Sequence, residues 1–234
     1  MNAPLATRTF KALSALLTYP NEELQAAIPE IEAILFSDAV VASASLHKLA
    51  PLLADLKAHE LYDLQERYVE LFDRTRRLSL HLFEHIHGES RDRGQAMVDL
   101  AAHYKRGGLN PSLNELPDYL PLFLEFLATR PFDEARGLLS ETAHILSLLE
   151  ERLAKRGSAY AAVFAAILST VDEIAVLPDV SDSVEPPDDL AALDAAWEET
   201  AVTFGPGDAM DACSVGRLRT QVRAGRRDAR QATA

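Results

Sequence analysis

The stretch of sequence that decides the fold is residues 68–109, which read YVELFDRTRRLSLHLFEHIHGESRDRGQAMVDLAAHYKRGGL. Its apolar residues recur every three or four positions, the spacing that places side chains on one face of a helix. If that helix continues past Phe72, one apolar face and one polar face extend as far as Ile86. The apolar face would hold Tyr68, Leu71, Phe72, Leu78, Leu82, Phe83 and Ile86, and the opposite face Glu70, Arg74, Arg77, His81, Glu84 and His85.

Gly88 interrupts this pattern, and a second helical pattern follows it. Ser90 is of a type that caps helix N-termini, and Asp92 would lie in the first turn, where a carboxylate favours the helix dipole. Gly107 and Gly108 supply a stop signal. The sequence therefore predicts two helices that meet at a polar elbow, HGESRDRG.

Residues 81–97, HLFEHIHGESRDRGQAM, closely resemble the signature of the respiratory nitrate reductase delta subunit family, the NarJ-type molybdenum-cofactor assembly chaperones. Two further stretches are similar to this superfamily: residues 12–20, ALSALLTYP, and residues 115–119, ELPDY, where Tyr119 stands in place of a common histidine. The resemblance covers roughly residues 10–150. The signature residues at the elbow are His85, Gly88, Glu89, Ser90, Arg91, Asp92, Arg93, Gly94 and Gln95.

The resemblance implies an all-α, single-domain helical bundle of the redox-enzyme maturation chaperone type. It implies a system-specific chaperone, not an enzyme, that binds the catalytic alpha subunit of nitrate reductase. The family recognises that subunit's N-terminal segment, a relic of a twin-arginine export signal. It assists insertion of the molybdenum cofactor before membrane attachment. We expect the chain itself to hold no cofactor and no metal.

The rest of the chain also predicts helices, because no segment alternates convincingly with period two. Pro29 would kink or split the second helix, Ser43 or Ser45 would cap the third, and Asp118 would cap a short helix at 119–128. The predicted helices cover about 10–19, 22–35, 43–56, 59 onward, 119–128, 132–149 and 159–176.

Three regions are predicted from the composition: a helical chaperone domain at 1–177, an acidic linker with a short helix at 178–204, and a disordered tail at 205–234. Residues 178–199 hold eight acidic residues and no basic one, and the tail is rich in arginine.

The formal net charge of −13 disfavours nucleic acid and anionic lipid as partners and favours a basic one. The single cysteine, Cys213, excludes an intramolecular disulfide. The N-terminal residues lack the apolar core of a signal peptide, and the longest apolar run, residues 159–168, is half of the roughly 20 residues that span a bilayer. These features predict a soluble cytoplasmic protein with no direct membrane insertion.

A client helix would need an apolar groove, and an acidic rim would favour lysine or arginine in that client. The candidate apolar residues can equally be ordinary core residues, and the two carboxylates can simply form a cap and a turn. The peptide-binding candidates are Tyr68, Leu71, Phe72 and Leu82, with Tyr119 and Phe123 opposite and Glu115 and Asp118 at the rim.

An alternative function is a metal-dependent hydrolase, because His81, Glu84 and His85 match the H-x-x-E-H pattern. Two histidines one helical turn apart can share a metal ion, with the glutamate as general base. A catalytic zinc also needs a third protein ligand, which no second motif supplies. A charged helix face explains the same residues.

Overall fold

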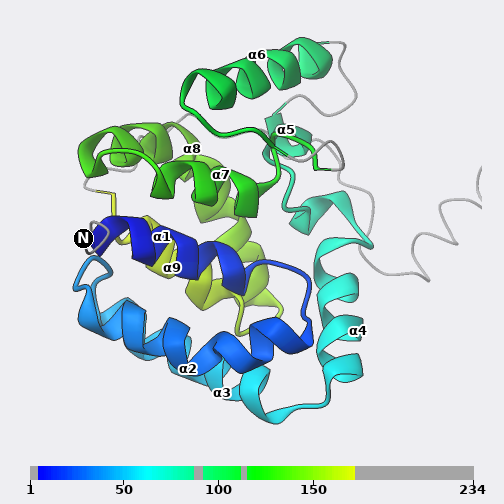
Figure 1. Ribbon diagram of the computed structural model, residues 1–234. Coiled ribbons are helices and arrows are strands. Elements are labelled where there is room, and N and C mark those ends of the chain that lie inside the picture. The colour runs from blue at the N-terminus through cyan, green and yellow to red at the C-terminus, as the bar shows by residue number, and fades with distance from the viewer. Residues whose placement is uncertain (1–4, 87–91, 112–114, 172–234) are drawn as a thin grey trace, which may run out of the picture. The chain divides into compact units, whose positions relative to one another are not determined.

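The computed structural model describes residues 5–86, 92–111 and 115–171, and all of its regular elements in these ranges are helices (Figure 1). The predicted all-α fold is confirmed for this part of the chain. The elements are α1 (Leu5–Leu16), α2 (Glu22–Ser37), α3 (Ser43–Ala58), α4 (Leu61–Phe72), the 3-10 helix η1 (Arg76–Leu78), α5 (Leu82–Ile86), α6 (Asp92–Arg106), α7 (Leu120–Ala128), α8 (Phe132–Lys155) and α9 (Ala161–Leu168).

The core forms around α1, which lies between α2 and α7 (Figure 1). Eight of the nine residues of α7 are buried, and the exception is Glu125, the one charged residue of this helix. The hydroxyl of Ser14 donates a hydrogen bond to the carbonyl of Pro121 at 2.7 Å, so α1 and α7 are joined by a polar contact as well as by packing. The apolar helix α9 packs against α3 and α8 and completes this core.

Several helix ends follow the local sequence. The side chain of Asn21 accepts a hydrogen bond from the amide of Leu24 at 2.7 Å and so caps α2. Pro29 lies inside α2 without splitting it. The stop after α6 is also as predicted, with Gly108 at a φ of 85°, a conformation that favours glycine. Ser43 and Ser45 do not cap α3, because Ala42 is its N-cap and only its carbonyl engages the first turn.

The prediction of one helix running from Tyr68 to Ile86 is wrong. Helix α4 ends at Phe72, and the chain then passes through η1 into an extended segment. That segment pairs with the chain before α7: Leu120 donates its amide to the carbonyl of Leu80 at 2.8 Å, and Leu82 donates to that of Asp118 at 3.0 Å. These long-range backbone bonds replace the helical ones, and the short α5 starts only afterwards.

Several predictions fall outside the described residues: the signature residues Gly88, Glu89, Ser90 and Arg91, the end of the helix expected at 159–176, the acidic linker, the arginine-rich tail and Cys213. The domain boundary near residue 177 also stays a prediction. Within the described ranges, no helix combines the length and the apolar content that crossing a membrane requires.

Gly107 gives a stability prediction, because a Cβ atom there would lie 2.5 Å from Cε2 of Phe126. Phe126 is buried and packs against the ring of Tyr104, so it cannot move away freely. We expect Gly107→Ala to lower the free energy of unfolding by about 1–3 kcal/mol in urea denaturation. Gly137→Ala in α8 is the matched control: its Cβ meets no atom within 4 Å, and it should raise stability by up to about 1 kcal/mol. Equal free energies of unfolding for the two variants would contradict the close approach of Gly107 to the ring of Phe126.

Candidate functional site

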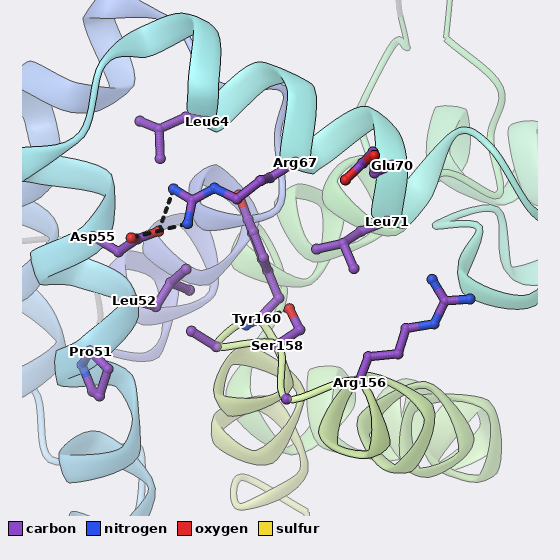
Figure 2. Close-up of a pocket in the computed structure, with 12 residues that line it drawn as sticks. Pro51, Leu52, Asp55, Leu64, Arg67, Glu70, Leu71, Arg156, Ser158 and Tyr160 are labelled. Atoms are coloured by element: carbon purple, nitrogen blue, oxygen red, sulfur yellow. Dashed lines mark hydrogen bonds and ion pairs between the residues drawn. The ribbon is translucent and has the colours of Figure 1, made fainter.

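A pocket of about 440 Å³ opens between α3, α4 and the loop that joins α8 to α9 (Figure 2). This volume is within the range of ligand-binding clefts. Its lining combines apolar side chains, among them Leu52, Leu71 and Tyr160, with four charged ones that lie around them. The pocket can therefore accept apolar groups. Its other lining residues are Pro51, Asp55, Leu64, Arg67, Glu70, Arg156, Gly157, Ser158 and Ala159.

One wall of the pocket is an ion pair between two helices. Arg67 of α4 reaches to Asp55 of α3 with nitrogen–oxygen distances of 2.8 and 3.2 Å (Figure 2). This two-point geometry fixes both side chains more firmly than a single contact would. The arginine side chain is 44% exposed, so the pair stabilises the fold by at most about 1 kcal/mol, and its main effect is to define the shape of the wall.

Beneath the pocket, aromatic rings lock α4 to the rest of the core. The ring of Tyr160 meets that of Phe72 edge-on, with centroids 5.1 Å apart. The hydroxyl of Tyr68 donates to the carbonyl of Leu17 at 2.8 Å and lies 3.2 Å from the hydroxyl of Tyr119. Burial raises the pKa of Tyr160, so its phenol stays neutral. These contacts hold α4 in place and turn Leu71 toward the pocket.

The predicted peptide-binding residues are therefore divided by the structure. Leu71 lines the pocket, and Tyr119 is half-buried beside Tyr68. Tyr68, Phe72, Leu82 and Phe123 are each at most 5% exposed. The sequence pattern had left open whether these residues are groove or core, and the structure places these four in the core.

Asp118 is fully buried, so the prediction that it forms an exposed acidic rim is wrong. The sequence had also predicted that Asp118 caps α7, and this prediction is wrong, because the N-cap of α7 is Tyr119. The carboxylate of Asp118 accepts hydrogen bonds from the amide of Phe83 at 3.2 Å and from Nδ1 of His81 at 3.1 Å, and therefore caps the start of α5. Arg93 lies 3.9 Å away and also contacts Glu84 at 3.2 Å. Glu115 is exposed, and its role at a binding rim stays a prediction.

The described signature residues differ in their surroundings. His85 donates from Nε2 to the carbonyl of Ser79 at 2.8 Å, and burial lowers its pKa. Arg93 joins α6 to Glu84 of α5. Asp92 and Gln95 lie at the exposed start of α6, where Gln95 donates to Asp99 at 2.9 Å. A Cβ atom on Gly94 would meet no atom within 4 Å. His85 thus ties α5 to the segment before it, and Arg93 ties α6 to α5.

The hydrolase alternative finds no support in this geometry. His81 lies before α5, not on it, and its ring faces Asp118. The Nε2 atom of His85 faces a backbone carbonyl. Over residues 5–86, 92–111 and 115–171, no group of three His, Cys, Asp or Glu side chains could hold a metal ion.

Sequence reasoning missed most of the pocket. Arg67 precedes Leu71 by one turn and could have been found on the same helix, but Asp55 and Tyr160 come from distant segments. No local pattern signals that these three regions converge.

Comparison with known proteins defines the family. The family model described as nitrate reductase delta subunit matches residues 21–166, more than half of the chain. The chain belongs to the nitrate reductase delta subunit family. The signature at residues 81–97 had predicted this membership.

Relatives within the delta subunit family share most of the chain. It is 45% identical over 201 residues to the nitrate reductase molybdenum cofactor assembly chaperone NarJ of Escherichia coli K12, an alignment that covers 82% of this chain and 83% of NarJ. It is 44% identical to the probable assembly chaperone NarW of the same organism, covering 83% of this chain and 82% of NarW. The probable chaperone NarJ of Bacillus subtilis is 32% identical, over 79% of this chain and all of that protein. These relatives make the chain a NarJ-type member, and they are named as chaperones, not as catalysts.

Replacing Asp118 tests whether its buried carboxylate stabilises the fold. We expect Asp118→Ala to lower the free energy of unfolding by about 1–3 kcal/mol, because the variant removes the cap of α5 and leaves His81 and Arg93 beside an empty position. Glu115→Ala is the control: it removes an exposed carboxylate three residues before Asp118 and should change stability by no more than about 0.5 kcal/mol. Urea denaturation of both variants measures the difference. Equal effects would show that the buried carboxylate is not a structural anchor.

His85 should make stability depend on pH. Its pKa is lowered in the folded state, so the unfolded chain takes up a proton more readily, and folded-state stability falls as pH drops below about 6.5. His85→Gln keeps a donor for the carbonyl of Ser79 but does not titrate. We expect the wild-type melting temperature to fall more steeply than that of the variant between pH 7.5 and 5. Parallel melting profiles over this range would contradict the assignment.

Proposed function

We propose that this chain is a dedicated assembly chaperone for a respiratory nitrate reductase. It binds the N-terminal segment of the catalytic alpha subunit in the cytoplasm and keeps the apo-enzyme competent for molybdenum cofactor insertion before membrane attachment. The observation that carries the proposal is the 45% identity to NarJ over 82% of the chain. No step in this role requires bond-making by the chain itself.

The physical chemistry of the chain supports a binding role. A net charge of −13 attracts a basic client segment and speeds its encounter with the chaperone. The pocket beside α4 combines apolar side chains, which can desolvate apolar groups of a client, with charged ones. The helices around it are fixed by buried contacts such as the one from Tyr68 to the carbonyl of Leu17, so the surface is formed before the client arrives.

Co-expression with the alpha subunit tests this function. We expect this chain to co-purify with a tagged alpha subunit. Much less of this chain should co-purify with an alpha subunit that lacks its N-terminal segment. Molybdenum in the purified alpha subunit, measured by mass spectrometry, should fall several-fold when the chaperone is omitted. The catalytic subunit of an unrelated molybdoenzyme serves as the specificity control.

The outcomes separate the parts of the proposal. Absence of co-purification together with unchanged molybdenum content would refute the chaperone function. Equal capture of the full-length and shortened alpha subunits would show that the client is recognised elsewhere than at its N-terminal segment.

A further inference from the structure

The outward face of α4 is rich in carboxylates. Asp63, Glu66, Glu70 and Asp73 are all exposed, and their spacing of three or four residues places them on one side of the helix. We call these four residues the acidic stripe. Glu70 belongs both to the stripe and to the pocket lining, so the stripe borders the pocket.

Two arginines, Arg67 of α4 and Arg74 just after its end, offset this charge only partly. Arg67 already faces Asp55 at 2.8 Å, across the pocket wall. Arg74 lies 3.4 Å from Glu70, and both side chains are about half exposed, so their attraction is weak in water. The four carboxylates of the stripe therefore leave this side of the pocket with a net negative charge.

The opposite side of the pocket carries a cation. Arg156 lines it, directly after the end of α8. Figure 2 shows Arg156 rising from the α8 end, across the pocket from Asp55 and Leu52. A ligand with one apolar face and one basic face would consequently be attracted in one orientation, with its basic groups toward α4.

We propose that the pocket seats large apolar side chains of a basic amphipathic helix whose lysine or arginine residues lie along the acidic stripe of α4. The inference rests on the proposed function and deepens it, because the occupant is the N-terminal segment of the alpha subunit. About 440 Å³ accommodates two side chains of leucine or phenylalanine size, which is what one helical turn of an amphipathic peptide presents. Carboxylates spaced by one turn on α4 match basic residues spaced by one turn on the client.

Fluorescence anisotropy with a labelled synthetic peptide of the alpha subunit's N-terminal segment tests the pocket. Leu71→Asp places a charge in the apolar lining and should weaken binding at least about ten-fold. Val69→Asp is the matched control: it lies two residues away on α4, is 37% exposed and does not line the pocket. It should change the affinity less than about two-fold. Melting curves of both variants verify that they fold.

A second pair of variants tests the stripe without touching the core. Glu66→Gln with Glu70→Gln should weaken peptide binding about two- to five-fold at low salt and flatten the salt dependence. Glu30→Gln with Glu32→Gln makes the same charge change at exposed positions of α2 and should leave affinity and salt response as in the wild type.

The results distinguish this inference from the proposed function. If the wild type binds the peptide but the stripe variant keeps wild-type affinity and salt response, the inference is wrong while the chaperone function stands. Wild-type affinity of a folded Leu71→Asp variant would overturn it in the same way. A wild type that neither binds the peptide nor co-purifies the alpha subunit would remove the proposed function itself.

Discussion

The buried carboxylate of Asp118 is the constraint on which the placement of α5 and its contact with α6 depend. A charge in the interior is tolerated only with partners, and here those are the amide of Phe83, the ring of His81 and, at longer range, Arg93. Moving α5 or the start of α6 would strip partners from this carboxylate. The loop that holds Asp118 leads directly into α7, which packs on α1, so α5 is tied to the centre of the core.

The neighbouring Tyr119 extends this frame toward α4. Its hydroxyl meets that of Tyr68, and Tyr68 also bonds to the carbonyl of Leu17, so α4 is fixed against α1 from the inside. Because the inward face of α4 is occupied in this way, Leu71 and Arg67 are left to form the pocket. A chaperone surface built on fixed helices spends little binding free energy on its own ordering, which suits recognition of a short client segment.

The sequence predicts what depends on neighbours along the chain. The long apolar stripe of α8 and the strongly apolar α7 follow from local periodicity, and Asp92 lies in the first turn of α6 as predicted. The break after Phe72 does not, because it depends on pairing between Leu80 and Leu120, forty residues apart. The sequence assigned Asp118 as the cap of α7 for the same reason. In the structure its carboxylate accepts from the amide of Phe83, far away in the sequence, and so caps α5. The family signature indicated a function before any geometry was known, yet most apolar residues chosen for binding are core residues.

The central claim is that a fixed polar and aromatic frame presents α4 and its pocket to the client. Hydrogen–deuterium exchange, with and without the alpha subunit's N-terminal peptide, tests it most directly. The account predicts that the amides of Phe83 and Leu120 exchange slowly in the free protein, and that the peptide slows exchange in α4 and at residues 156–160. Fast exchange at Phe83 and Leu120 in the free protein, or peptide protection that leaves both α4 and residues 156–160 unchanged, would contradict it.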